Sequence, residues 1–330
     1  MKTIFRSKES AVLGLFVIVF AGFAFTTDRF ATSDNLFNVA RQYSELAVVA
    51  VGLTMIIITG GIDISVGSVI GLSSILVGVL AGQAHMNIWA ACVLAIVAGL
   101  ACGAINGLVI TKLNVQPIVA TLAMMSAARG LAFVLSGARS LSDFPQSFVD
   151  LGQTSVGPVP IIGYIPLPVI VALLLVVLGV VVLRYTSFGR QVYAVGAAEE
   201  AARLSGVNVF RVKMFAYAVT GMLCGLGGVM MSSRVASSVP DAGSGFEFEA
   251  ITAVVMGGSS LKGGEGNIIG TIIGVAVMGI LRNGLNLRGV PNIWQVMFLG
   301  IMLILAVLAD NLRGWLRANR ELRQPIKDSI

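Results

Sequence analysis

Long apolar runs recur along almost the whole chain and limit what it can fold into. One of them, residues 167–183, reads LPVIVALLLVVLGVVVL and contains no charged residue. Only helices and closed barrels satisfy every backbone polar group inside a bilayer, and a barrel would show short segments of alternating polarity. Charged residues make up only 12% of the 330 residues, against about 25% in soluble domains. The sequence therefore predicts an all-α, polytopic membrane protein built as one bundle.

About ten runs are candidates for membrane-spanning helices. They comprise residues 11–25, 46–60, 66–81, 88–110, 117–135, 166–183, 214–231, 248–256, 268–281 and 293–309. The first run also fits a secretory signal peptide, but the many spans behind it favour a retained first helix. No linker or low-complexity stretch divides the runs, so we expect residues 1–330 to form a single transmembrane domain.

Basic residues predict the orientation of the bundle, because Lys and Arg are enriched in cytoplasmic loops. They gather in the N-terminus, in residues 184–213 and in the C-terminus: Lys2, Arg6, Lys8, Arg184, Arg190, Arg203, Arg211, Lys213, Arg313, Arg317, Arg320 and Arg323. With ten spans, all three segments and both termini are cytoplasmic, and residues 136–165 lie outside. This topology accounts for the formal net charge of +6 without nucleic acid as a partner.

Residues that carry catalytic or metal-binding chemistry are sparse. Cys92, Cys102 and Cys224 lie in apolar runs without metal-ligand spacing, and His85 is the only histidine. No G-x-x-x-x-G-K-[ST] loop occurs, and the glycine-rich run 257–266 has the wrong spacing for a phosphate cradle. We therefore expect no metal site, no cofactor and no enzymatic activity in this chain.

The stretch EEAARLSGVNV, residues 199–209, predicts one short amphipathic helix that ends at a glycine. Acidic residues are favourable at its start, and Gly206 can take the left-handed conformation beyond a helix end. So short a helix is marginal in water by itself. It is either a plain surface helix or a helix that docks on a partner, whose groove would supply the missing burial.

Glu200-Ala201-Ala202, followed after three residues by Gly206, resembles the EAA-x-x-x-G signature of ABC importer permeases. In that family the signature forms a coupling helix that fits a groove on a separate ATP-binding subunit. The resemblance implies a coupling role for Glu199, Glu200, Ala201, Ala202, Arg203 and Gly206. An accidental match on a surface helix is the alternative.

Four longer blocks resemble the ribose-type branch of bacterial sugar permeases. They are GGIDISVGS (60–68), YAVGAAEEAARLSGVNV (193–209), AITAVVMGGSSLKGGEGNIIGTIIG (250–274) and NGLNLRGVPNIWQ (283–295). The resemblance implies a multi-pass permease in the lipid of the bacterial inner membrane, paired with a second permease copy or a paralogue. It also implies cytoplasmic ABC ATPase subunits that hold ATP and magnesium, and a periplasmic sugar-binding protein. The branch includes permeases for ribose, galactose, xylose, inositol, autoinducer-2 and nucleosides, and ribose is the substrate we expect.

Two of the apolar runs break at a double glycine, Gly60-Gly61 and Gly257-Gly258, and a similar helix start follows each break. Interrupted spans in corresponding halves point to a transport pathway. The predicted topology puts both breaks toward the cytoplasm, where they would form an inner gate. Glycines that only let helices pack closely are the alternative.

Polar residues within the runs are candidates for the pathway, because they are costly in lipid. The ionisable candidates are Asp63, Arg129, Glu249 and Arg282. Each fits a buried structural pair equally well, for example Asp63 with Arg129. The hydrogen-bonding candidates, which suit a neutral sugar, are Asn106, Gln116, Thr121 and Asn286. The alternative to an ATP-driven importer is an ion-coupled secondary transporter with Asp63 or Glu249 as its ion site.

Overall fold

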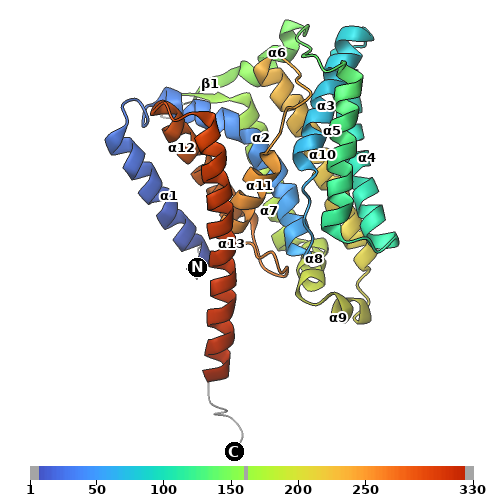
Figure 1. Cartoon of the computed structure of the whole chain (residues 1–330), viewed down its shortest axis with the longest axis vertical. Coiled ribbons are helices and arrows are strands. Elements are labelled where there is room, and N and C mark those ends of the chain that lie inside the picture. Colours follow the sequence, from blue (N-terminus) through green and yellow to red (C-terminus); the bar gives the residue numbers. More distant parts are fainter. Residues whose placement is uncertain (1–6, 160–162, 324–330) are drawn as a thin grey trace, which may run out of the picture.

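The computed structural model describes residues 7–159 and 163–323 (Figure 1). Its elements are α1 (Ser7–Thr26), α2 (Ser33–Ile58), α3 (Val66–Gly78), the π-helix η1 (Val79–Gln83), α4 (Ile88–Lys112), α5 (Pro117–Ser136), α6 (Gln146–Gln153), β1 (Ser155–Val159), β2 (Gly163–Pro166), α7 (Leu167–Tyr185), α8 (Ser187–Ala197), α9 (Glu199–Leu204), α10 (Val209–Val235), α11 (Phe246–Met256), α12 (Ile268–Leu287) and α13 (Asn292–Arg323). Strands β1 and β2 pair antiparallel. Lys2 and Arg6, two of the basic residues that predict the orientation, lie outside the described residues.

Each of the ten apolar runs lies on a helix, which confirms an all-α bundle. Among the described residues, eight helices are long and apolar enough to cross a membrane: α2, α3 with η1, α4, α5, α7, α10, α12 and the first part of α13. The apolar stretch of α1 is shorter, and α11 has 11 residues. At 1.5 Å per residue, α11 is about 16 Å long, roughly half of a ~30 Å hydrocarbon core. Ten full crossings therefore stay a prediction.

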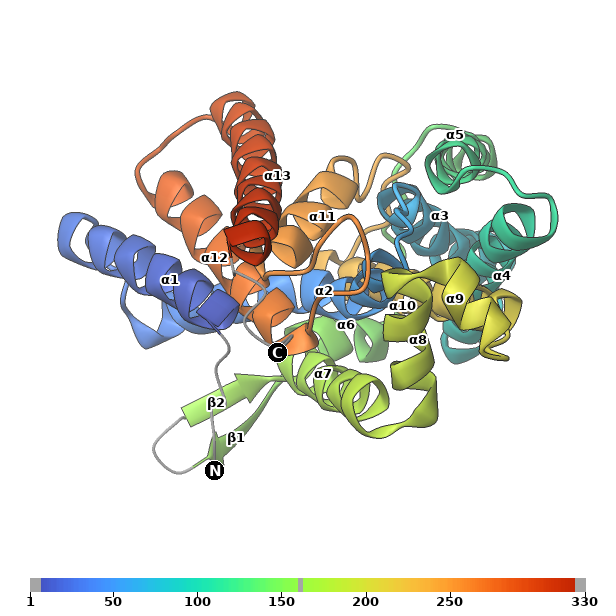
Figure 2. The ribbon, with the colours of Figure 1, turned by 90° about the horizontal axis from the view of Figure 1, so that it is seen from below.

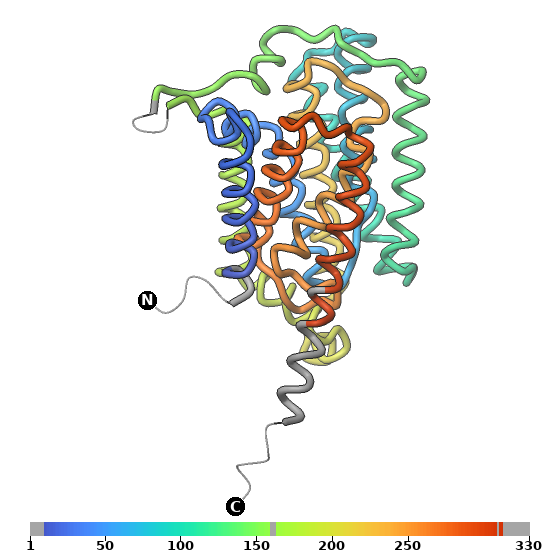
Figure 3. Tube along the Cα trace, turned by 60° about the vertical axis from the view of Figure 1, so that its left-hand side comes forward, coloured from blue at the N-terminus to red at the C-terminus, as the bar shows by residue number. Residues whose placement is uncertain are grey.

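The bundle has two distinct ends (Figures 1 and 3). Helices α8 and α9 lie at one of them, the α9 end, whereas α6 and the β1–β2 hairpin lie at the other, the α6 end. Helix α1 begins at the α9 end, and α13 runs toward it. The first and last helices thus share a side with residues 184–213, as the basic residues predict, and the assignment of that side to the cytoplasm stays a prediction.

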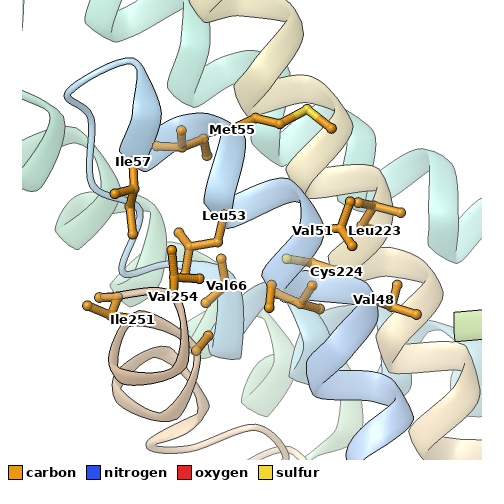
Figure 4. Packing of buried hydrophobic residues seen from close by; sticks show 14 of the residues in the cluster. Val48, Val51, Leu53, Met55, Ile57, Val66, Leu223, Cys224, Ile251 and Val254 are labelled. Atoms are coloured by element: carbon orange, nitrogen blue, oxygen red, sulfur yellow. The ribbon is translucent and has the colours of Figure 1, made fainter. Parts of the chain in front are cut away.

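Helix α2 passes through the middle of the bundle, as the view from below shows (Figure 2). Figure 4 shows its side chains, Leu53 among them, packed between Leu223 of α10 and Val254 of α11. The helix begins well before the predicted run at residue 46, because its polar side chains find partners inside the protein. Glu45 is 2% exposed, and its two carboxylate oxygens accept hydrogen bonds of 2.7 and 3.1 Å from Arg234 of α10.

The units α2–α5 and α10–α13 repeat one order of elements in opposite directions. Each has a long helix, a non-helical segment, a short helix and two further helices. Helix α2 starts at the α6 end, where Arg41 donates to Ser155 of β1, whereas α10 finishes there, where Ser233 donates to Phe148 of α6. In matching fashion, α3 packs on α5 and α11 packs on α13. Inverted repeats of this kind are a common plan of transporters.

The repeat corrects one expectation about the double glycines. The counterpart of the first break, residues 59–65, is the segment 236–245 between α10 and α11. Gly257-Gly258 instead ends α11 and opens the turn to α12. The pairing of the two double glycines was wrong, because the second half breaks in the polar turn-forming residues SSVPDAGSG, which contain no double glycine.

The predicted outer loop was 136–165, and its described parts, residues 136–159 and 163–165, lie at the α6 end. They contain α6 and most of the hairpin. Leu141 forms an isolated antiparallel bridge with Ser238, and the Gln153 side-chain amide donates a 3.2 Å hydrogen bond to the Arg234 carbonyl. These contacts fix the outer segment on the end of α10.

Candidate coupling and translocation site

Helices α8 and α9 form a short helical hairpin at the α9 end. The Thr186 hydroxyl caps α8 by accepting from the Gly189 amide at 3.2 Å. Helix α9 is shorter than the predicted 199–209, since it ends at Leu204 and α10 starts at Val209. Gly206 lies between them with φ of +86°, which confirms the left-handed turn after the helix.

One face of α9 is open. Ala202 packs inward at 6% exposure, whereas Glu200, Ala201 and Arg203 are exposed and Leu204 is 82% exposed. An exposed apolar side chain at the end of a six-residue helix does not stabilise the folded chain by burial. The open face suits a contact with a partner.

One ion pair fastens α9 to the start of α10, and two others lie within α9. Lys213 Nζ lies 2.6 Å from Glu199 Oε2, and Arg203 lies 3.4 Å from Glu199 and 3.5 Å from Glu200. The two Arg203 pairs are exposed and contribute about 0–1 kcal/mol each. The Lys213 side chain is mostly buried, so its pair holds α9 in place on α10.

Helix α8 contacts both double-glycine turns. The Tyr193 hydroxyl donates a 2.8 Å hydrogen bond to the Gly266 carbonyl. The Gly264 amide donates at 2.8 Å to the carbonyl of Ile58, the last residue of α2. Gly196 of α8 lies directly over that bond, because a Cβ there would overlap the Ile58 oxygen and approach the Gly264 nitrogen to 2.5 Å. The ends of α2 and α11 and helix α8 therefore meet at one junction.

A cavity of about 540 Å³ lies beside α9, between the α4–α5 turn and the start of α10. Gln116, expected in the pathway, lines this cavity together with Glu199, Arg203 and Lys213. The structure thus places Gln116 at the α9 end, next to the candidate coupling helix.

The first break carries a buried polar cluster. Asp63 is 2% exposed, and its Oδ1 accepts hydrogen bonds from the Ser65 amide at 2.8 Å and the Ser65 hydroxyl at 2.6 Å. The Asn106 amide donates to Ser65 Oγ at 3.0 Å. The hydroxyl oxygens of Thr121 and Tyr217 each lie 3.5 Å from the Ile62 carbonyl oxygen. The structure therefore brings Asp63, Asn106 and Thr121 together around one interrupted span.

Arg129 belongs to the second break, and its suggested pairing with Asp63 is wrong. Its guanidinium donates at 3.0 Å to the Pro240 carbonyl and at 2.7 Å to the Ala242 carbonyl. A hydropathy pattern indicates that such a charge needs a partner. It cannot predict that the partners are backbone carbonyls of a segment far away in the sequence. Arg129 thus crosses from α5 to the segment 236–245.

Two further groups stand apart from these clusters. Glu249 forms an ion pair with Arg282 of α12. Asn286 is exposed near the α6 end, where it accepts a 2.6 Å hydrogen bond from the Gln295 side chain. The predicted site residues therefore fall into separate places, and only some of them lie at the breaks.

The two short helices meet first turn to first turn. Gly67 in the first turn of α3 touches Gly243, which precedes α11, and a Cβ on Gly67 would also overlap Glu247 Oε2. Glu247 was not among the predicted residues. The predicted run began at Phe248 and left Glu247 just outside it, although the polar residues before this run could have indicated an interruption.

A comparison with known proteins agrees with this architecture. The family model for the permease component of branched-chain amino acid transport systems matches residues 35–307. The chain is 38% identical over 306 residues to the ribose import permease protein RbsC of Escherichia coli (strain K12), covering 92% of this chain and 94% of the relative. It is 41% identical over 307 residues to RbsC of Bacillus subtilis (strain 168), covering 92% of each chain.

A third relative is the autoinducer 2 import system permease protein LsrD of Photorhabdus temperata, 32% identical over 330 residues that cover 96% of this chain and 97% of the relative. No solved structure matches the chain. The matched span includes both interrupted helices and α9, and the multi-pass helical bundle accords with it. The chain belongs to the family of permease components of branched-chain amino acid transport systems.

Proposed function

We propose that this protein is the membrane subunit of an ATP-driven importer and moves ribose across the bacterial inner membrane. The observation that carries the proposal is the 38–41% identity to ribose import permeases over 92% of the chain. The alignments cover nearly the whole chain, and the interrupted helices are the part of it that would form the path. The chain itself supplies the path, and ATP hydrolysis with its magnesium resides on a cytoplasmic ATPase subunit.

Helix α9 is the proposed docking element for that ATPase subunit. Its exposed Ala201 and Leu204 would enter a groove of the partner, and its ion pair to Lys213 would pass the force to α10. Four residues further along α10, Tyr217 lies against the first break: its hydroxyl would be 2.5 Å from a Cβ on Gly61. Helix α8 supplies a second route, through Gly196 to the turns after α2 and α11.

This arrangement supports alternating access. ATP binding would move the α8–α9 hairpin, and both inner turns would move with it. A periplasmic sugar-binding protein would deliver the solute at the α6 end, where residues 136–165 are held on α10. A second permease copy or a paralogue would complete the path, which needs weak polar contacts and no covalent intermediate.

The proposal is tested with proteoliposomes that contain the permease, its ATPase subunit and the binding protein. Uptake of labelled ribose that requires ATP and continues after ionophores collapse all ion gradients is the expected result. Uptake that needs an ion gradient and ignores ATP would instead favour the secondary transporter. Because one relative is named for autoinducer 2, that compound is the competing solute to include.

A further inference from the structure

Glu247 differs from the other buried acidic residues among those described. Four carboxylates are at most 9% exposed: Glu45, Asp63, Glu247 and Glu249. Glu45 and Glu249 bind arginines, and Asp63 accepts two hydrogen bonds from Ser65. Glu247 Oε2 is buried and has no hydrogen-bond partner. An unsatisfied buried acceptor is costly, so its retention calls for a physical reason.

The unpartnered oxygen lies where the two halves of the inverted repeat meet. It sits in the first turn of α11, against Gly67 in the first turn of α3. A Cβ on Gly67 would overlap both Glu247 Oε2 and the Gly243 carbonyl oxygen, and a Cβ on Gly243 would overlap the Gly67 carbonyl oxygen. The two glycines therefore let the first turns of α3 and α11 pack closely, so that Glu247 Oε2 lies against the backbone of α3.

Gly67 and Glu247 are both buried at the junction. Since α11 is only about 16 Å long and ends at the α9 end, its first turn is roughly half-way through the hydrocarbon core. The segment before it is non-helical, and its Asp241 and Ser244 are exposed in the single chain. Non-helical backbone at this depth is tolerated only where protein covers it or where it lines an aqueous cavity.

Local charge decides which ligand suits the oxygen. Arg129 already places its guanidinium on the carbonyls of Pro240 and Ala242, and both helix N-termini carry positive partial charge. These groups disfavour a second cation beside Glu247, while the carboxylate itself disfavours an anion. A neutral donor such as a hydroxyl group fits both conditions.

From this geometry we infer that Glu247 Oε2 accepts a hydroxyl of the transported solute when the α3–α11 junction opens to the path. The ligand class is a neutral polyhydroxylated solute. The inference rests on the proposed function and adds to it one specificity-determining residue at mid-membrane. Oε2 has no hydrogen-bond partner in the closed junction, so an entering hydroxyl that donates to it forms a charge-assisted hydrogen bond.

The test combines a change in the side chain with a change in the solute. ATP-driven uptake is measured in the reconstituted complex for ribose and for each monodeoxyribose, at solute concentrations low enough that the rate is proportional to concentration. The quantity compared between variants is the ratio of the ribose rate to the monodeoxyribose rate. The binding protein is the same in every arm, so its own selectivity cancels between wild type and variant. Glu247→Gln is the main variant. Glu249→Gln is the matched control on the same helix, since Arg282 already binds that carboxylate.

We expect one monodeoxyribose to be moved about tenfold less well than ribose by wild type, because it leaves the acceptor unpaired. The ratio should fall below about threefold in Glu247→Gln, since hydrogen bonds to charged groups are roughly twice as strong as neutral ones. Glu249→Gln should keep the wild-type ratio even if its uptake is lower. Glu247→Asp, which keeps the charge and moves the oxygen, serves if Glu247→Gln fails to assemble, and should also reduce the ratio.

Unchanged ratios for every analogue in both Glu247 variants would overturn the inference and leave the proposed function standing. A sodium requirement that disappears in Glu247→Gln would overturn it in favour of a cation ligand. Absence of ATP-driven ribose uptake by wild type would overturn the proposed function together with the inference.

Discussion

Gly196→Ala probes the junction where α8 meets the turns that follow α2 and α11. A Cβ at this position would overlap the Ile58 carbonyl oxygen and lie 2.5 Å from the Gly264 nitrogen. Those two atoms belong to the 2.8 Å hydrogen bond that joins the end of α2 to the turn after α11. One methyl group therefore has to push α8 away from both turns or break the bond between them.

The magnitude follows from opposing effects. Overpacking a well-packed site costs about 1–3 kcal/mol, and loss of the Gly264–Ile58 hydrogen bond costs about 1 kcal/mol. Replacing glycine by alanine inside a helix returns about 1 kcal/mol. The expected net loss is about 1–3 kcal/mol, a shift of several degrees in Tm at about 2–4 °C per kcal/mol.

The assay pairs thermal unfolding of the purified complex with the ratio of ribose moved to ATP hydrolysed. Gly196→Ala should lower Tm and also lower the ratio, because α9 still docks while its movement no longer reaches the turns. Gly130→Ala is the matched control, a helical glycine of α5 with no atom within 4 Å of its Cβ position. Equal Tm and equal ratios for the two variants would refute the role assigned to Gly196.

Three further variants test other contacts. Gly206→Val places a β-branched residue at φ of +86° in open space. The strain of about 1–2 kcal/mol should abolish ATP-driven uptake while membrane insertion stays normal, and Gly206→Asn should retain uptake. Normal uptake in both variants would remove the coupling assignment. Arg129→Ala leaves the Pro240 and Ala242 carbonyls without this donor and should reduce the yield of assembled complex. Arg129→Lys should partly restore the yield. Wild-type yield and uptake in Arg129→Ala would show that the contact is dispensable. Glu45→Gln leaves the partly buried Arg234 without its counter-charge and should destabilise the complex by up to about 3 kcal/mol. The pair Glu45→Leu with Arg234→Met should recover most of this loss in thermal unfolding, and equal stability of single and double variants would contradict the role of the ion pair.

The helices could be predicted from the sequence because each apolar run is long compared with a turn. The start of α2 could not, since Arg41 and Glu45 look like the end of a span until their partners are known. Arg41 donates a hydrogen bond to Ser155, and Arg234 neutralises Glu45. A hydropathy scale reflects the free energy of transferring a side chain into lipid. Partners in the folded protein lower that free energy, and the scale does not include them. Boundaries therefore failed where charged residues were paired inside the bundle.

The site was predictable only where a residue's conformation depends on its neighbours in the sequence. The left-handed turn at Gly206 depends on that residue alone, and the expected conformation is present. The partners of Arg129 and the position of Glu247 depend on a segment that returns into the bundle, about 110 residues from Arg129 along the chain. The inverted repeat was missed because its two halves share only the order of their elements and run in opposite directions, and a double glycine was a misleading marker.

The short α11 has a consequence for how the nascent chain enters the membrane. Its 11 residues carry Glu247 and Glu249 in the first turn, so the translocon would gain too little by releasing it into lipid alone. Arg282, which neutralises Glu249, is synthesised 33 residues later on α12. Insertion of α11 therefore has to wait until α12 has left the ribosome, and the two helices partition into the bilayer as one hairpin. Ribosome-bound chains halted before Arg282 should leave α11 accessible to water-soluble thiol reagents at engineered cysteines, and chains halted beyond α12 should protect it.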